Sequence, residues 1–257
     1  KLKRAVTSST VMQHFKTGLP IRLDVDASPV GLGAILLQDH GNGDFKPVSY
    51  ASRSLSSVEQ RYSQTEREAL GVIWACEKFH LYVYGKRITI QTDHKPLIGL
   101  FSTGGNRSAR INRWALRLLQ YDFELQYLPG QDNPADVLSR CPTKHAQVDQ
   151  HWSSGYELET EQHINQIIAH SIPKTLTLSQ IREACLTDEE TKSLIDALGN
   201  NKWTRYPQVK AYNYKKVSPE LTHQGGIVLK GNLIVVPSSL RQTVLAVSYT
   251  HLRAHET

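Results

Sequence analysis

Runs of alternating polar and apolar residues along the first half of the chain predict a β-sheet. These runs are rich in β-forming residues and are bounded by turn-forming clusters such as DHGNGD at residues 39–44, which is the usual signature of strands. We expect five strands, at residues 21–27, 31–38, 45–54, 87–92 and 121–128. The first three follow one another closely enough to form an antiparallel meander.

Helical patterns separate the later strands. Residues 58–80, 95–101 and 108–120 are predicted helices, and NPADVLSR begins another, with Asn133 as its N-cap and Pro134 at the first helical position. The order β-β-β-α-β-α-β-α therefore predicts an α/β domain over residues 20–142. In it, a mixed five-stranded sheet carries helices on both faces.

The polar stretch after residue 142 predicts a change of organisation. Residues 143–177 are interpreted as a linker, and residues 178–198 have a helical pattern. A hairpin around Gly231–Asn232 is expected within residues 226–237, and residues 238–247 are expected to be helical. The C-terminal part is thus predicted to be a small α+β segment.

Composition narrows the class of protein without identifying it. The 257 residues are 39% hydrophobic, which is enough for a packed core, and no apolar run is long enough to cross a bilayer. Three widely spaced cysteines argue for a reducing, intracellular setting. The net charge is +6, and residues 1–142 hold 18 Lys and Arg against 13 Asp and Glu. This excess suggests a polyanionic partner, although an ordinary basic domain would account for it equally well.

Two aspartates on the first predicted strand raise the question of chemistry. Asp24 and Asp26 lie on one face of that strand by its period of two, and Leu23 and Val25 lie on the other. A carboxylate on a central strand has to be paired or solvated. The pattern alone does not say which of the two aspartates has a functional role.

Three further carboxylates come from separate elements. Glu68 falls on the face of the 58–80 helix that should pack on the sheet, whereas Glu66 is expected on the solvated side. Asp93 ends the fourth strand and Asp136 lies in the first turn of the last helix, where each could be a helix-capping or dipole-pairing residue. Converging carboxylates repel one another unless divalent cations neutralise them, which makes Mg²⁺ the expected cofactor.

The motifs DAS, GLGAILLQ, KPVSYASRSLS, EREAL, TDHKPL and NPADVLSR, in this order, resemble the ribonuclease H domain of gypsy-type LTR retrotransposon Pol polyproteins. The resemblance implies an RNase H fold over residues 20–142 and hydrolysis of the RNA strand of an RNA–DNA hybrid. It implies two Mg²⁺ ions, replaceable by Mn²⁺, held by Asp26, Glu68, Asp93 and Asp136. It therefore selects Asp26 over Asp24.

The flanking sequences resemble neighbouring parts of such polyproteins. Residues 1–19 resemble the end of a reverse-transcriptase connection, and residues 178–257 a truncated segment ahead of an integrase zinc-binding module. The resemblance implies a polymerase domain and a downstream integrase as partners, no membrane, and a cytoplasmic virus-like particle or the nucleus as location. His251 and His255 could form half of a zinc site, but no cysteine follows Cys185, so zinc binding is not expected.

Substrate contacts are predicted on the helix at residues 108–120. Its basic arc is a candidate for phosphate binding, although a solvated basic face would look the same; its members are Arg107, Arg110, Arg113 and Arg117. His94, beside Asp93, is a candidate for proton transfer or for capping. The alternative functional hypothesis is a catalytically silent RNase H-like module that binds nucleic acid or holds a polyprotein together. An integrase core is disfavoured because the glutamate comes second in the acidic series.

Overall fold

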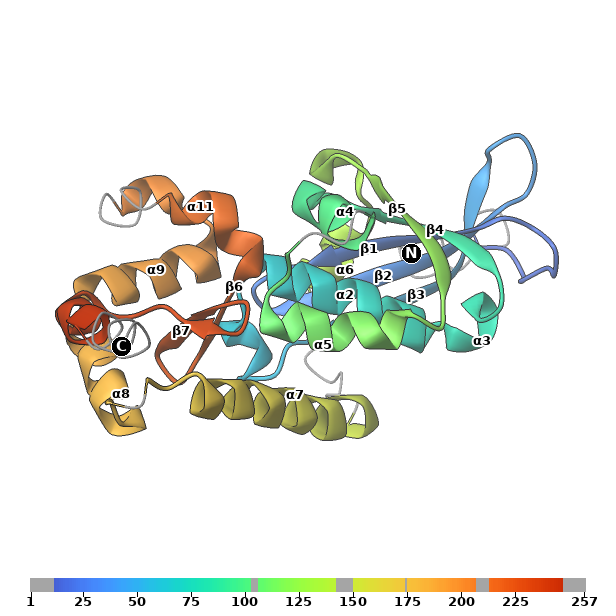
Figure 1. Ribbon diagram of the computed structural model, residues 1–257. Helices are drawn as coiled ribbons and strands as arrows, with labels where there is room; N and C mark the ends of the chain where they lie inside the picture. The colour runs from blue at the N-terminus through green and yellow to red at the C-terminus, as the bar shows by residue number, and fades with distance from the viewer. Residues whose placement is uncertain (1–11, 103–105, 142–149, 174, 207–212, 247–257) are drawn as a thin grey trace. The chain divides into compact units, whose positions relative to one another are not determined.

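The computed structural model describes residues 12–102, 106–141, 150–173, 175–206 and 213–246 (Figure 1). The chain forms two compact units, and neither is one continuous stretch of sequence. Unit 1 comprises Lys1–Arg61, Thr65–Gly105 and Arg113–Ser154, and unit 2 comprises Tyr62–Gln64, Asn106–Asn112 and Gly155–Thr257. Two short pieces from within the predicted 20–142 domain therefore belong with the C-terminal part of the sequence.

Unit 1 contains the predicted five-stranded sheet. Its strands are β1 (Ile21–Ala27), β2 (Gly31–Asp39), β3 (Phe45–Ser54), β4 (Arg87–Thr92) and β5 (Asp122–Tyr127). They are arranged in the order β3-β2-β1-β4-β5. The β1–β2 and β2–β3 pairs are antiparallel, and the β1–β4 and β4–β5 pairs are parallel. The prediction of a mixed α/β sheet is confirmed.

Helices cover both faces of this sheet (Figure 1). The helices of unit 1 are α2 (Gln64–Lys78), α3 (His80–Val83), α4 (Lys95–Ser102), α5 (Ala109–Leu118, shared with unit 2) and α6 (Ala135–Arg140). Gly71 of α2 approaches Val25 on one face. On the other face, Gly33 of β2 lies against the backbone of α6, beside a small core of Ile35, Leu37 and Ala135.

The predicted helix at residues 58–80 is divided into three parts in the structure. A 3₁₀ turn, η1 (Glu59–Arg61), precedes α2, and α3 follows it. The turn is held by a buried ion pair in which Arg53 donates to both carboxylate oxygens of Glu59, at 2.6 and 2.8 Å. Because Glu59 is committed to Arg53 and also accepts from the Ser56 amide at 2.9 Å, this segment forms a separate turn before the helix.

Unit 2 is built from helices around a small antiparallel sheet. Its elements are α7 (Gln150–His170, whose first residues belong to unit 1), α8 (Leu178–Thr187), α9 (Glu189–Asn200), η3 (Trp203–Arg205), α11 (Tyr214–Val217), η4 (Ser218–Glu220), β6 (Leu221–Gln224), β7 (Ile227–Lys230), β8 (Leu233–Ile234) and η5 (Ser238–Leu240). The β7–β8 hairpin turns at Gly231–Asn232 as predicted. Asp188 ends α8 and caps α9, so the single helical pattern at residues 178–198 is two helices.

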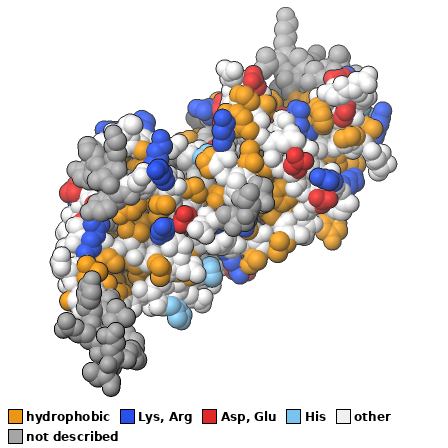
Figure 2. Space-filling view, turned by 45° about the horizontal axis from the view of Figure 1, so that its top comes forward, with side chains coloured by type: hydrophobic (Ala, Val, Ile, Leu, Met, Phe, Trp, Pro, Cys, Tyr) orange, Lys and Arg blue, Asp and Glu red, His pale blue; other side chains and the backbone are white. Residues whose placement is uncertain are grey.

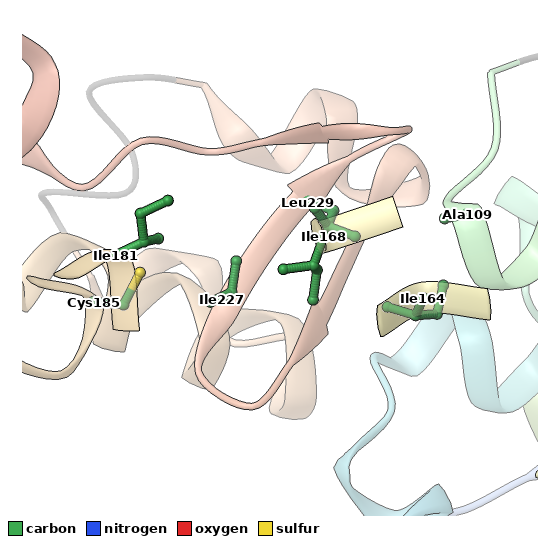
Figure 3. Packing of buried hydrophobic residues seen from close by; sticks show 7 residues of the cluster. All are labelled: Ala109, Ile164, Ile168, Ile181, Cys185, Ile227 and Leu229. Carbon is green, nitrogen blue, oxygen red and sulfur yellow. The ribbon is translucent and has the colours of Figure 1, made fainter. Parts of the chain in front are cut away.

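The segment interpreted as a linker is largely helical. Helix α7 occupies most of residues 143–177, and its Ile164 and Ile168 pack with residues of α8 and β7 (Figure 3). The full cluster is Ala109, Ile164, Ile168, Ile181, Cys185, Ile227 and Leu229. The linker prediction failed because these packing partners are distant in sequence. In the described part of the chain, no helix is long and apolar enough to cross a membrane.

Candidate active site

The carboxyl ends of the parallel strands β1 and β4 bring two aspartates together. Pairing between these strands ends where Asp24 lies opposite Gln91, so Asp26 and Asp93 each follow two residues after the last pair. At β1 the sheet also changes from antiparallel to parallel pairing. The strand order also reverses at β1, which has β2 and β3 on one side and β4 and β5 on the other. In open α/β sheets, ligands usually bind outside the carboxyl ends of the strands at such a reversal.

A third carboxylate reaches the same end of the sheet from helix α2. A Cβ at Gly71 would lie 3.2 Å from Val25 Cγ1, so the middle of α2 runs close to β1. Glu68, about one turn earlier, is 3% exposed. One carboxylate oxygen each from Asp26, Glu68 and Asp93 lie within 4.8 Å of one another. The structure therefore brings together three of the four predicted site residues.

Asn133 fixes the start of α6 beside the central strand. Its Nδ2 donates to the Val25 carbonyl oxygen at 3.0 Å, and its Oδ1 accepts from the Ala135 amide at 3.1 Å. The structure places the N-cap at Pro134, without a side-chain cap, and begins α6 at Ala135, so the predicted helix start is one residue early. The Asn133 side chain joins this start of the helix to β1, next to Asp26.

The rest of α6 is attached to the sheet at close range. Ser28 Oγ donates to the Ser139 carbonyl oxygen at 2.8 Å, and Ser52 Oγ donates to the Leu138 carbonyl oxygen at 2.6 Å. A Cβ at Gly33 would lie only 2.7 Å from the Ser139 amide nitrogen. Only glycine allows this approach, which sets the distance between α6 and the carboxylates on β1.

Asp136, the fourth predicted site residue, lies near the group of three without being a member of it. Its Oδ1 accepts a hydrogen bond from Arg140 Nε at 2.6 Å, one turn along α6. Repulsion from Asp136 contributes to the raised pKa values of Asp26 and Asp93. It is therefore close enough to act electrostatically on the cluster from its rim.

Burial disfavours negative charge at this site. It is the main cause that raises the pKa of Asp26 to about 6; the Ser139 hydrogen bond lowers this pKa, and Asp93 and Asp136 raise it further. Burial also raises the pKa of Asp93, again with a contribution from Asp136. A bound cation would favour the ionised carboxylates instead. Oxygen ligands at this spacing fit a hard divalent cation such as Mg²⁺.

Asp24 has a different partner and stands outside the cluster. Its carboxylate is fully buried and lies 2.8 Å from Arg22 Nε. The Arg22 guanidinium is in turn stacked 4.5 Å from the centre of the Phe45 ring. The structure therefore separates the two aspartates that strand parity could not distinguish.

His94 contacts a helix and is held as a neutral imidazole. Its Nε2 lies 3.2 Å from Thr65 Oγ1, at the start of α2. Burial lowers the pKa of His94 to about 4. A ring that is neutral at pH 7 and packed in this way connects β4 to α2, and it is a poor candidate for the acid in proton transfer.

The predicted arginine row does not form one surface. Arg110 is 0% exposed, and its guanidinium donates to Thr222 Oγ1 at 3.0 Å and to Glu161 Oε1 at 3.1 Å. A phosphate cannot reach a side chain buried in this way, so the prediction for Arg110 is wrong. The helical wheel could not reveal it because Glu161 and Thr222 are far away in sequence.

The other three arginines are half-buried. Arg117 forms an ion pair with Glu77 of α2. Arg107 belongs to unit 2, whereas Arg113 and Arg117 belong to unit 1. Basic and acidic side chains are interspersed among hydrophobic ones on the face shown in Figure 2. A nucleic-acid contact by these arginines stays a prediction.

Two residues near the site were not identified from the sequence. Ser139 donates a hydrogen bond from its hydroxyl to Asp26 Oδ2, and Arg140 pairs with Asp136. A signal was available, since positions three and four residues after Asp136 share its helix face. His251 and His255, considered above as half of a zinc site, lie outside the described residues.

Comparison with known sequences gives a consistent set of relatives. Residues 16–121 match the family model described as "RNase H-like domain found in reverse transcriptase". The chain is 41% identical over 144 residues to the Retrovirus-related Pol polyprotein from transposon 412 of Drosophila melanogaster, covering 56% of this chain and 12% of that relative. It is 35% identical over 143 residues to the Transposon Tf2-3 polyprotein of Schizosaccharomyces pombe, covering 54% of this chain and 11% of that relative. The chain thus spans about one eighth of these relatives.

Solved structures give weaker likenesses. A foamy viral protease-reverse transcriptase (dRH) in complex with ds DNA is 17% identical, with a TM-score of 0.43, over 52% of this chain and 25% of that chain. RNase H1 from the halophilic archaeon Halobacterium salinarum is 14% identical, with a TM-score of 0.36, over 48% of this chain and 95% of that chain.

Proposed function

Because residues 16–121 match the family model of an RNase H-like domain found in reverse transcriptase, we propose that this part of the chain hydrolyses the RNA strand of RNA–DNA hybrids. The observation that carries the proposal is the meeting of Asp26, Glu68 and Asp93, with ligand oxygens within 4.8 Å of one another. Each of the three carboxylates comes from a different element. Bringing three negative charges together does not stabilise the fold by itself. Such a cluster has a clear use in metal-assisted phosphodiester hydrolysis.

In this proposal the carboxylates bind two Mg²⁺ ions, with Mn²⁺ as a substitute. Asp26, Glu68 and Asp93 supply the central ligands, and Asp136 supplies the fourth from the rim after release from Arg140. The bound cations would lower the pKa of the attacking water and stabilise the leaving 3′ oxygen. The products are a 3′-hydroxyl and a 5′-phosphate. His94 keeps a structural role in this scheme.

The hybrid is proposed to lie along a surface to which Arg113 and Arg117 contribute, with Arg107 as a further candidate and Arg110 excluded by its burial. Phosphate contacts of this kind weaken as salt is added. The other proposed partners are the polymerase domain and the integrase of the same polyprotein. The proposed setting is a cytoplasmic virus-like particle or the nucleus.

A cleavage assay on a labelled RNA–DNA hybrid with Mg²⁺ tests the proposal. Removal of a ligand charge in Glu68→Gln should reduce the cleavage rate by at least about 100-fold, since even changes outside the ligand set cost 10–100-fold. Glu124→Gln is the matched control, because Glu124 is a half-exposed carboxylate on β5 outside the cluster. Its rate should equal that of the wild type.

The same assay separates the enzyme from a silent binding module. A wild-type protein that binds the hybrid but leaves it uncut in both Mg²⁺ and Mn²⁺ would overturn the proposal and favour the binding module. Equal loss of activity in Glu68→Gln and Glu124→Gln would also contradict it, because the effect would then not belong to the cluster.

A further inference from the structure

The hydroxyl of Ser139 connects the two elements that carry the first and last site carboxylates. It lies on α6, is 0% exposed, and donates a hydrogen bond to Asp26 Oδ2 of β1. The main-chain oxygen of Asp136 is a second acceptor at 3.0 Å. One buried hydroxyl thus contacts Asp26 directly and Asp136 through its backbone.

Ser139 is itself fixed by contacts that do not involve the carboxylates. Its carbonyl oxygen accepts from Ser28 Oγ at 2.8 Å, and its amide nitrogen lies where a Cβ on Gly33 would clash, at 2.7 Å. Backbone anchors on both sides leave the hydroxyl little freedom. The Asp26 carboxylate is therefore held in one orientation by a rigid donor.

From this geometry we infer that Ser139 is a positioning residue for cation binding, which holds the Asp26 carboxylate in the orientation that meets Glu68 and Asp93. The inference rests on the proposed function for the identity of the cation. Ser139 contributes no ligand of its own, because its hydroxyl is already directed at Asp26. Groups that orient metal ligands in this way commonly change metal affinity 10–100-fold when removed.

A purely structural role for the Ser139 hydroxyl would also explain these contacts. The experiment must therefore distinguish it from the positioning role. A serine in a helix often bonds back to the carbonyl oxygen three residues earlier, as Ser139 does to Asp136. Ser52 provides the matched control, because its hydroxyl donates to the Leu138 carbonyl oxygen of the same helix at 2.6 Å and touches no carboxylate. Loss of either hydroxyl removes one bond between α6 and the sheet, but only Ser139→Ala releases Asp26.

Calorimetric titration of the whole chain with Mn²⁺, without nucleic acid, tests the inference. Ser139→Ala should raise the dissociation constant by about 10–100-fold, and Ser52→Ala should raise it less than about 2-fold. Thermal unfolding in EDTA should shift similarly in both variants. If Ser139→Ala does not fold, Ser139→Cys takes its place, since the thiol fills similar space and is a weak donor.

The outcomes are distinguishable from those of the cleavage assay. Equal dissociation constants for the Ser139 variant and Ser52→Ala would overturn the inference, as would a wild type that takes up no Mn²⁺. A wild type that binds Mn²⁺ and loses affinity in Ser139→Ala, yet cuts no hybrid, supports the positioning role and overturns only the proposed function.

Discussion

The carboxyl group of Asp26 lies where the fold favours its neutral form. Only 4% of the residue is exposed, and burial with two nearby aspartates raises its pKa to about 6. The unfolded value is about 3.9. An acid whose pKa is higher in the folded state contributes stability below its unfolded pKa and loses it as the pH rises through the folded one.

This predicts how the metal-free protein responds to pH. Between about pH 4 and pH 7, ionisation of Asp26 should cost the wild type about 3 kcal/mol of unfolding free energy, at 1.36 kcal/mol per pKa unit. Asp26→Asn cannot ionise, so in EDTA it should be the more stable protein at pH 7.5 and nearly equal at pH 4. Urea unfolding at both pH values measures the difference.

Added Mg²⁺ supplies the control for this prediction. The cation should stabilise the wild type at pH 7.5 by mass action and should have less effect on Asp26→Asn. If the two proteins differ by the same amount at pH 4 and pH 7.5, the pKa of Asp26 is not raised in the folded state.

Single residues could be predicted from the sequence where local geometry decided their position. The helical wheel sufficed to place Glu68 on the buried face of its helix. Strand parity placed Asp24 and Asp26 on one face, and the family resemblance was needed to select Asp26. Strand parity could not show that Arg22 pairs with Asp24, because the side chains of Arg22, Asp24 and Asp26 all lie on the same face of the strand. The prediction that Glu66 faces solvent is wrong, since that residue is 0% exposed; its burial depends on the tertiary structure and not on helix periodicity.

At the scale of elements, the position of α6 depends on one glycine. A Cβ at Gly33 would lie 2.5 Å from the Ala135 carbonyl oxygen and 2.7 Å from the Ser139 amide nitrogen. Both are backbone atoms, so they cannot move aside without moving the helix. The helix also carries Asp136, and its Ser139 contacts Asp26.

Gly33→Ala should therefore impair both stability and the site. Overpacking of this kind costs about 1–3 kcal/mol, and displacement of α6 should lower cleavage activity in the protein that remains folded. Gly99→Ala is a suitable control, because a Cβ there meets nothing within 4 Å and alanine favours the helix α4 by up to about 1 kcal/mol. Thermal unfolding and the cleavage assay are the measurements.

An unchanged unfolding temperature and activity in Gly33→Ala would show that α6 is not held as closely as described. The sequence predicted the start of α6 to within one residue, through Asn133 and Pro134, because helix-start signals are local. The close approach to Gly33 could not be predicted, since it depends on which strand the helix meets. The helical nature of residues 150–170 was missed for the same reason, as Ile164 and Ile168 find their partners only in the folded unit.

At the scale of the whole molecule, helix α5 is shared by the two units. Its first residues, up to Asn112, belong to unit 2, and Arg113 begins the part that belongs to unit 1. Within unit 2, Arg110 binds Glu161 and Thr222 and lies 4.2 Å from the centre of the Tyr62 ring. The Arg110 side chain therefore contacts three segments of unit 2 that are distant from one another in sequence.

Removal of Arg110 should destabilise unit 2. In Arg110→Ala, Glu161 loses a cation in a mostly buried position, and breaking such a pair costs about 3–5 kcal/mol. Amide hydrogen exchange at β6 and β7 should become faster. Arg113→Ala, one turn along the same helix but in unit 1, should leave exchange in these strands unchanged.

A contrary result would restore the role predicted from the sequence. If Arg110→Ala leaves exchange unchanged while the hybrid is bound more weakly and with a smaller salt dependence, the side chain contacts phosphate. A phosphate contact and a buried ion pair therefore give opposite results in the same two measurements.

The interleaving of the two units has a consequence for inheritance. Recombination between two related genes at the position of residue 142 would combine Tyr62 and Arg110 from one parent with the C-terminal part of the chain from the other parent. The offspring would keep the carboxylates of the candidate active site on one parental segment, yet unit 2 would have parts from both parents. Exchanges that keep unit 2 intact must transfer residues 62–64 and 106–112 together with residues 155–246, and we expect surviving recombinants to show this linkage.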